Sequence, residues 1–477
     1  QAMFDLAENY KDGKNGVEKN EEEAIRYYKL VAEDESAGED MVENACFRLG
    51  WIMSNNEDEK DDVEAVSWYE KAMEKGSQGA ITNLGWMYEN GKGVTQDYEK
   101  AIELYKKAAD AGEDYAMNNL GWIYEYGKDG QEVNLEEALK WYKLAAEKNH
   151  DGAQESVERV LQSIYDLAGN YKDGKNGVEK DEKEAIQYYK LVAEEDWAGD
   201  DMIRGACFYL GWIMQVNDTE EDDTEAVSWY EKAIEKGSVM AMNNLGNMYR
   251  NGKGVSQDDE KAMELYKQAA DDGEDYAMNN LGRIYENGDC GQEKNLEEAL
   301  KWHKLAAENG YDGAQESVER ILQAMCDLAE NYKDGKNGVE KNEEEAIRYY
   351  KLAAEDESAG DDILENACFW IGWIMAKNDA EEDDAEAVLW FEKAIEKGNN
   401  GNGNNWLGWM YEKGKGVPKD YEKAVELYKK AADTKSGYAQ NKLGEIYENG
   451  HGGQVNLEEA LKWYKLAAEN GYDGAQE

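Results

Sequence analysis

Residues 116–124 read Ala116-Met-Asn-Asn-Leu120-Gly-Trp-Ile-Tyr124, and residues 134–146 read Asn134-Leu-Glu-Glu-Ala-Leu-Lys-Trp-Tyr-Lys-Leu-Ala-Ala146. In the first stretch, small and apolar residues fall at i, i+4, i+7 and i+8, which is the spacing of one helical face. In the second stretch, Asn134 stands where a helix N-cap is preferred, and Glu137 follows three residues later as in a capping box. The two stretches predict a pair of short α-helices.

This helix pair is a repeat. A Leu-Gly or Leu-Ala step occurs at Leu6, Leu49, Leu84 and Leu120 and returns at Leu167. A longer repeat encloses these steps, because the segment that begins at Gln1 starts again at Gln162 and Gln323. We predict three copies of four helix pairs each, residues 1–161, 162–322 and 323–477, with the last helix truncated. Because the chain starts and ends at the same point of the repeat, we expect the array to continue beyond this chain.

Stacking of these pairs is the predicted route to a core. A lone helical hairpin cannot cover its own apolar face, whereas stacked neighbours form a continuous core. The composition suits this, with 41% hydrophobic residues, 15 Trp and 32 Tyr, and with one Pro against 47 Gly. Gly76 and Gly112 fall just past predicted helices, where a left-handed residue ends a helix at little steric cost. We predict an all-α solenoid of stacked helix-turn-helix repeats.

The charge of the chain restricts its partners. Asp and Glu number 106 against 53 Lys and Arg, which gives a net charge of -53. Such a surface repels phosphate backbones and anionic lipids, so the sequence argues against nucleic-acid binding and favours basic partners or cations. No apolar run approaches the ~18–20 residues of a membrane-spanning helix, so membrane insertion is not expected either.

The repeat pattern resembles a known family. Residues 80–109 carry Ala-x-x-x-Leu-Gly-x-x-Tyr, then Gly-x-Gly-Val, then Asp-x-x-Lys-Ala-x-x-x-Tyr-x-x-Ala-Ala. This pattern resembles the Sel-one-like repeat family, a branch of the tetratricopeptide-like solenoids, and related patterns cover essentially the whole chain. The resemblance implies a right-handed superhelix of helix pairs that serves as a scaffold for protein partners. Some secreted members of that family carry a cysteine pair in each repeat, and its absence here favours a cytoplasmic over an extracellular location.

Residues that could carry catalysis do not recur with the repeat. His150, His303 and His451 stand at non-equivalent places in the three copies, which indicates surface variation instead of acid–base or zinc chemistry. The loops Gly91-Lys-Gly-Val94 and Gly252-Lys-Gly-Val255 lack the spacing of a phosphate-binding loop and are expected to be turns. We therefore predict that the chain is not an enzyme and needs no cofactor.

The three equivalent cysteines among the five are expected to be structural. Cys46, Cys207 and Cys368 are equivalent, each in Ala-Cys-Phe, whereas Cys290 and Cys326 occur once. The equivalent cysteines lie one whole copy apart, far beyond the ~7 Å limit for a disulfide bridge. We predict buried small apolar residues and no nucleophile.

Tryptophans fall into two classes according to what replaces them in equivalent repeats. One class stands on second helices and is replaced only by bulky residues such as Tyr27 or Leu104, which indicates core positions. Its members are Trp68, Trp141, Trp229, Trp302, Trp390 and Trp463. The other class follows the Leu-Gly or Ile-Gly step and is replaced by Asn247, Arg283 and Glu445, which indicates a surface position.

The second class is the predicted partner-binding site. Its members are Trp51, Trp86, Trp122, Trp212, Trp373 and Trp409. Exposed tryptophans at one repeated position would form an aromatic track for a protein partner. Partial packing of each ring on the next repeat is the alternative.

Acidic loops recur once in each copy. They hold the candidate cation ligands Asp58, Asp61, Asp62, Asp222, Asp223, Asp383 and Asp384. Carboxylates suit calcium, but the spacing of a dedicated calcium loop is missing, so a solvated acidic face with weak calcium binding remains the interpretation.

Three hypotheses of function follow. The first is a non-enzymatic structural or interaction scaffold, part of a longer and fibre-forming array that associates with itself or with basic or aromatic-contacting proteins. The second is a calcium-responsive acidic repeat element. The third, from the family resemblance alone, is an adaptor in a quality-control or signalling complex.

Overall fold

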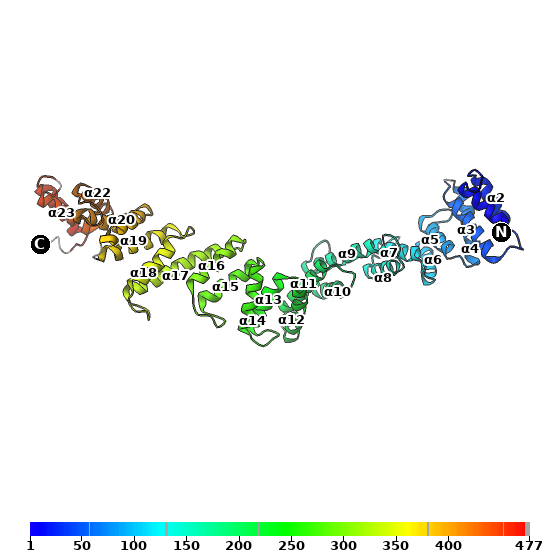
Figure 1. Cartoon of the computed structure of the whole chain (residues 1–477), viewed down its shortest axis with the longest axis horizontal. Helices are drawn as coiled ribbons and strands as arrows, with labels where there is room; N and C mark the ends of the chain where they lie inside the picture. The colour runs from blue at the N-terminus through cyan, green and yellow to red at the C-terminus, as the bar shows by residue number, and fades with distance from the viewer. Residues whose placement is uncertain (57, 129–131, 218, 379–380, 452, 473–477) are drawn as a thin grey trace. The chain divides into compact units, whose positions relative to one another are not determined.

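The computed structural model describes residues 1–477 except 57, 129–131, 218, 379–380, 452 and 473–477. Within the described residues it contains 24 α-helices and no β-strand (Figure 1). The helices divide into two compact units, which we call the N-terminal unit, Gln1–Ser238, and the C-terminal unit, Val239–Glu477. In both units each helix packs on the helices next to it in sequence, so the predicted all-α solenoid of helix pairs is confirmed.

The N-terminal unit consists of six consecutive helix pairs. Their bounds are α1 (Ala2–Asp12), α2 (Glu21–Ala32), α3 (Glu39–Ser54), α4 (Glu59–Glu74), α5 (Gln78–Asn90), α6 (Tyr98–Asp110), α7 (Asp114–Tyr126), α8 (Leu135–Glu147), α9 (Ala153–Asp173), α10 (Glu182–Ala193), α11 (Asp200–Asn217) and α12 (Glu220–Glu235).

The C-terminal unit consists of six further pairs. Their bounds are α13 (Val239–Asn251), α14 (Asp259–Asp271), α15 (Asp275–Asn287), α16 (Leu296–Glu308), α17 (Ala314–Asp334), α18 (Glu343–Ala354), α19 (Asp361–Lys377), α20 (Glu381–Glu396), α21 (Asn402–Lys413), α22 (Tyr421–Asp433), α23 (Gly437–Asn449) and α24 (Leu457–Glu469).

The sequence copies and the compact units have different boundaries. The copy boundaries after residues 161 and 322 fall inside α9 and α17, each a continuous helix of 21 residues. The division between compact units instead follows Ser238. The three copies therefore describe a period of the sequence, and whether each acts as a domain stays a prediction.

Polar caps start the second helix of the pairs, as the sequence predicts. Asn134 Oδ1 accepts the backbone N–H of Glu137 at 3.0 Å, and Asn20 Oδ1 accepts that of Glu23 at 3.1 Å. Gly76 and Gly112 follow their helices with φ of 102° and 93°, in the left-handed region that glycine adopts without strain. Local chemistry thus fixes where these helices begin and end.

The glycine of the Leu-Gly step makes room for an aromatic ring from the paired helix. A Cβ atom at Gly85 would lie 2.8 Å from the Tyr105 ring, and one at Gly121 would lie 2.7 Å from the Tyr142 ring. The Tyr105 hydroxyl then donates to Glu89 at 2.6 Å, so the buried ring keeps a polar partner at the end of the first helix. This contact holds the two helices of a pair together.

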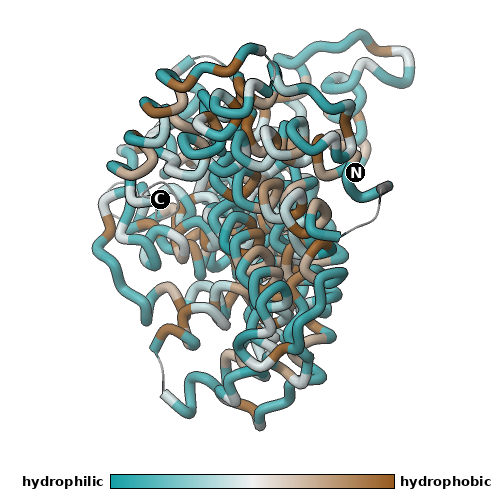
Figure 2. Tube along the Cα trace, turned by 90° about the vertical axis from the view of Figure 1, so that its left-hand side faces the viewer, coloured by the Kyte–Doolittle hydropathy of each residue, from teal (hydrophilic) through white to brown (hydrophobic). Residues whose placement is uncertain are grey.

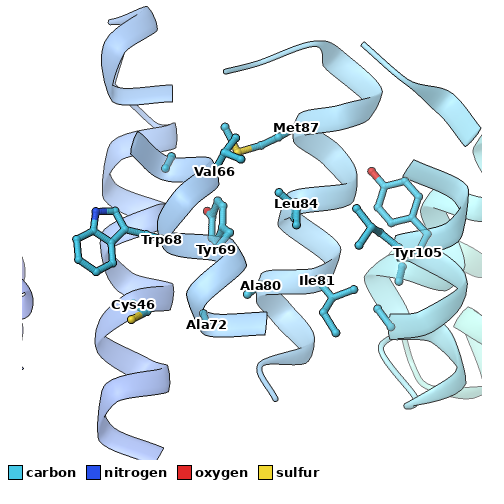
Figure 3. Close-up of a cluster of buried hydrophobic side chains, with 14 of the residues drawn as sticks. Cys46, Val66, Trp68, Tyr69, Ala72, Ala80, Ile81, Leu84, Met87 and Tyr105 are labelled. Carbon is cyan, nitrogen blue, oxygen red and sulfur yellow. The ribbon is translucent and has the colours of Figure 1, made fainter. Parts of the chain in front are cut away.

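Buried side chains from neighbouring helices form the core. Figure 3 shows Tyr69 of α4 and Leu84 of α5 facing each other in this core, while Trp68 lies on the opposite side of α4, toward the helix that carries Cys46. Hydrophobic residues recur at intervals along the helices, whereas the loops are mainly hydrophilic (Figure 2). In the described part of the chain, no helix is both long and apolar enough to cross a membrane.

The Gly-Lys-Gly-Val segments are turns that pack on the preceding repeat. Gly91 and Gly93 have φ of 64° and 66°, and a Cβ atom at Gly93 would lie 2.3 Å from the backbone oxygen of Asp62. Glycine is needed here both for its conformation and for close backbone approach. The prediction that these segments are turns is confirmed.

Candidate interaction surface

The six tryptophans of the predicted track all lie on first helices. Those of the N-terminal unit expose similar shares of their surface: Trp51 46%, Trp86 39%, Trp122 36% and Trp212 40%. In the C-terminal unit, Trp373 on α19 and Trp409 on α21 are half-buried. The structure therefore exposes a ring after the Leu-Gly step most clearly in the N-terminal unit.

Two of these tryptophans line one groove. It has a volume of about 510 Å³ and is bordered by α3, α4, α5 and α7. Its aromatic lining includes Phe47, Trp51, Trp86 and Tyr115. We call this groove the aromatic groove. Trp122 and Trp212 do not line it.

The repeat geometry explains why Trp86 faces outward. Leu84 is buried and Gly85 packs on the Tyr105 ring, so the residue after them points away from the core. On the same helix, Asn83 Nδ2 donates to the Tyr69 hydroxyl at 3.1 Å. Asn83 lines the groove as well and brings an amide beside the indole ring.

The α7 side of the groove carries an exposed ring and a carboxylate. Tyr115 is 62% exposed, and its ring meets that of His150 edge to face at 4.7 Å. The imidazole Nδ1 of His150 lies 2.9 Å from a carboxylate oxygen of Asp114. Burial, with a smaller effect of Asp114, raises the pKa of Glu113, which also lines the groove. A positive charge placed here would favour the ionised form of Glu113.

Lysines cover most of the exposed indole rings. Lys92 lies 5.4 Å from the ring centre of Trp86, Lys128 lies 4.8 Å from that of Trp122, and Lys172 lies 5.6 Å from that of Trp212. Among the residues that the structure describes, no Lys or Arg lies over Trp51. Trp51 is therefore the ring whose face is open to a cation or an aromatic group.

The C-terminal unit gathers four tryptophans instead of exposing them singly. Trp373 contacts Trp370 at 5.5 Å and Trp406 at 6.4 Å, and Trp406 contacts Trp409 at 5.5 Å between ring centres. Sequence analysis missed Trp370 and Trp406, although each stands three residues before a track tryptophan, a spacing that places both on one helical side. The ammonium of buried Lys333 lies 3.8 Å from the ring centre of Trp370 and 5.9 Å from that of Trp373, so this cluster already contacts a cation.

The other class of tryptophans is largely core. Trp68, Trp141, Trp229 and Trp390 are buried, as predicted, whereas Trp302 and Trp463 are half-buried. For the three equivalent cysteines, Cys46, Cys207 and Cys368, the predicted burial is confirmed. Burial raises the pKa of Cys207 and Cys368 to about 11 and that of Cys326 to about 12, so these thiols are poor nucleophiles. Cys46 is also buried and Cys290 is half-buried.

The interpretation of the histidines as surface variation is wrong for two of them. His303 is 0% exposed because it takes the buried position of Tyr142 on the second helix. The side chain of His150 is 8% exposed and packs on Tyr115. His451 stacks on Tyr421 with 4.8 Å between ring centres. The three are not brought together.

The acidic loops are not uniformly solvated, contrary to the sequence interpretation. One aspartate in each copy is buried with a carboxylate oxygen that accepts no hydrogen bond among the described residues: Asp62, Asp223 and Asp384. Each lies in the first turn of a second helix. At Asp62 and Asp384, the Gly-Lys-Gly turn of the next repeat packs on the backbone of this first turn.

Three of the remaining four cation candidates have local partners. Asp58 caps α4 by accepting the N–H of Lys60, Asp61 accepts Asn56 Nδ2, and Asp222 accepts the Thr219 hydroxyl. Asp383 is half-buried. The described residues contain no group of three or more His, Cys, Asp or Glu placed to hold a metal ion. Glu57 and the side chains of Glu59 and Glu381 lie outside the described residues, and the calcium response stays a prediction.

Comparison with protein families gives matches along almost the whole chain. The model described as Sel1 repeat matches residues 1–35, 44–77, 79–113, 114–150, 161–196, 205–238, 239–274, 275–311, 322–358, 366–399, 402–433 and 437–472. None of the curated proteins matches the chain at the required significance.

Solved structures include similar proteins. The protein c5321, a protective antigen present in uropathogenic Escherichia coli strains and displaying an SLR fold, is 33% identical, with a TM-score of 0.29, over 94% of this chain and 88% of that one. A Sel1 repeat protein from Oxalobacter formigenes is 31% identical, with a TM-score of 0.27, over 55% of this chain and 99% of that one. With these TM-scores, the relationship rests on sequence.

Proposed function

The chain belongs to the Sel1 repeat family, and we propose that it is a non-enzymatic scaffold whose aromatic groove binds an extended segment of a partner protein. Sel1 repeat proteins typically serve as protein-interaction scaffolds. The groove adds a place on this chain where such an interaction can occur.

The exposure of Trp51 and Trp86 within one groove is the observation that carries the proposal. Tryptophan is enriched among the residues that dominate binding energy, and a groove lets a partner side chain be desolvated on more than one side. Both rings lie where equivalent repeats carry Asn, Arg or Glu, so packing does not require them. Amides of Asn83 and Asn119 line the same groove and can bond a peptide backbone.

A basic and aromatic segment fits this groove best. Trp51 offers an uncovered ring face to a cation, and Glu113 offers a carboxylate whose ionised form a bound cation would stabilise. The net charge of -53 favours encounter with a basic partner, although Lys92 restricts access to the Trp86 face. A lysine or arginine beside an aromatic residue would use both features.

The other hypotheses concern the larger assembly in which this scaffold would act. A longer fibre-forming array and an adaptor in a quality-control or signalling complex both use protein contacts, and the length of the full protein would separate them. The five cysteines are free, which supports the proposed cytoplasmic location.

The test is selection of peptides on the chain, followed by affinity measurements on variants. Random displayed peptides would be selected against the wild-type chain, and dissociation constants of the selected peptides measured for Trp51→Asn and Trp86→Arg. We expect peptides rich in basic and aromatic residues and a loss of affinity of about tenfold or more in both variants.

Trp212→Asn is the matched control. Trp212 stands at the same repeat position with a similar exposure of 40%, but it lies outside the groove. Equal affinity of the selected peptides for the wild type, Trp51→Asn and Trp86→Arg would contradict binding in this groove.

A further inference from the structure

A second groove, in the C-terminal unit, has different chemistry. It has a volume of about 390 Å³ and is formed by α15, α17 and the loop that precedes α17. Asn279, Arg283 and Asn287 line it from α15, and Ser317 and Arg320 line it from α17. We call it the arginine groove. Its lining is mainly polar, whereas the lining of the aromatic groove is rich in aromatic side chains.

Arg283 differs from the other arginines of the chain. The sequence contains eight arginines, and seven of them pair with a carboxylate: Arg26, Arg48, Arg159, Arg204, Arg250, Arg320 and Arg348. Arg283 is exposed and pairs with no carboxylate of the described residues. In a chain with 106 acidic residues, a guanidinium without a carboxylate is available to an external one.

Asn279 lies one helical turn before Arg283 and is almost completely buried. It is 6% exposed, lines the groove, and its side chain forms no hydrogen bond within the described part of the chain. Its amide atoms reach the solvent of the groove, so they are open to a ligand. The amide can donate to an oxygen that the guanidinium holds at the same time.

One of the two carboxylates that line the groove is already paired with an arginine. Arg320 donates to both carboxylate oxygens of Glu286 at 2.8 Å, so that carboxylate is already neutralised. Asp312 is the other acid that lines the groove, and it is exposed. Acidic residues farther away act weakly, because charges beyond about 8 Å are largely screened at physiological ionic strength. The net charge of the chain as a whole therefore acts only weakly at this groove.

We infer that the arginine groove binds the carboxylate of a glutamate or aspartate side chain in a partner peptide. Arg283 would donate two parallel N–H bonds to the carboxylate, as guanidinium groups commonly do. Asn279 would donate a third. A carboxylate with a single charge fits better than a phosphate with two, because the groove supplies one unpaired cation beside Asp312. This proposal stands apart from the aromatic groove and holds even if that groove binds nothing.

The small number of arginines makes a direct test feasible. Arginine labelled with ¹⁵N gives one side-chain Nε–H signal for each of the eight residues, and Arg283→Gln identifies the Arg283 signal by its loss. The probes are a capped glycine–serine peptide with one central glutamate, the same peptide with glutamine, acetate, and inorganic phosphate. We expect the glutamate peptide to shift the Arg283 signal and to bind about tenfold more tightly than the glutamine peptide.

Variants locate the site. Arg283→Gln and Asn279→Ala should each bring the affinity for the glutamate peptide to that for the glutamine peptide, within about twofold. Arg204→Gln is the matched control, because Arg204 is a solvent-accessible arginine paired with Asp201 and lies outside the groove. Folding of Arg283→Gln is expected to be unchanged, since equivalent repeats carry Trp, Asn or Glu at this position.

Three outcomes would overturn the proposal. One is that the Arg283 signal does not move with the glutamate peptide. Another is that the glutamate and glutamine peptides shift it equally. The third is that acetate or phosphate binds as tightly as the glutamate peptide, which would show a site for small anions and no peptide site.

Discussion

Two equivalent regions, one in each unit, differ at the residues that matter most. In the N-terminal unit, Arg159 donates to both oxygens of Glu125 at 2.8 Å. In the C-terminal unit, Arg320 does the same to Glu286 at 2.8 Å. This arginine–glutamate pair links the first helix of one repeat to that of the next in both regions.

Around this shared pair, two positions change. The exposed residue is Trp122 in the first region and Arg283 in the second, and the buried ring is Tyr142 in the first and His303 in the second. The Tyr142 hydroxyl donates to Glu125 at 2.8 Å, whereas neither ring nitrogen of His303 forms a hydrogen bond with a described residue. Both regions keep a buried ring against the glycine of the first helix, Gly121 or Gly282, whereas the exposed residue changes from an aromatic to a basic one.

Removal of the buried ring should have the largest effect. Tyr142 fills the space that Gly121 leaves and is 1% exposed. We expect Tyr142→Ala to lower the free energy of unfolding by about 3–5 kcal/mol, as for other large buried side chains. Urea denaturation of the chain would measure this, and a loss below about 1 kcal/mol would show that the ring does not hold the pair.

The second prediction makes the two regions alike. His303→Tyr should place a hydroxyl near Glu286, as Tyr142 does near Glu125, and stabilise the chain by about 0.5–1.5 kcal/mol at neutral pH. Burial lowers the pKa of His303, and Arg320 and Arg283 lower it as well, against the opposing effect of Glu286.

The stabilisation by His303→Tyr should be larger at acidic pH than at neutral pH. Because the pKa of His303 is lower when folded than the ~6.5 of an unfolded histidine, the wild type binds fewer protons when folded and loses stability as pH falls below that value. The tyrosine variant lacks this loss. Urea denaturation at about pH 7.5 and about pH 5 would test it, and an equal gain at both pH values would contradict burial of a neutral imidazole.

Exchange of the exposed residues should have the smallest effect on stability. Trp122→Arg gives α7 the residue that α15 carries at the equivalent position, and Arg283→Trp gives α15 the residue of α7. We expect both to change the free energy of unfolding by no more than about 0.5 kcal/mol, as is usual for surface positions. A loss of several kcal/mol in Trp122→Arg would show that the ring is packed and would support the alternative to an aromatic track.

Most of the fold could be predicted because its signals are local. Asn134 with Glu137, the glycines after the helices and the Leu-Gly step each act within a few residues, and the repeat shows them many times. The continuity of α9 could not be predicted from these signals, because it depends on how the end of one copy joins the start of the next. The boundary after Ser238 depends on the packing of whole helices.

The candidate sites could be predicted only in part. Substitution by Asn, Arg and Glu at one repeat position indicated the exposure seen at Trp51 and Trp86. The groove between them could not be predicted, because Tyr115 reaches it from a different repeat. His303 could have been placed in the core, since it aligns with Tyr142. Asn279 gave no signal, because only the packing around α15 shows that its amide lines the groove without a hydrogen bond from a described residue.

Stability and binding measured on the same variant test most directly whether the aromatic groove binds a partner. For Trp51→Asn combined with Trp86→Arg, we expect a free energy of unfolding within about 1 kcal/mol of the wild type, together with a loss of affinity of about tenfold or more for peptides selected on the chain. A large loss of stability would show that these rings belong to the core. Unchanged affinity would show that the partner binds elsewhere, and either result would contradict the account.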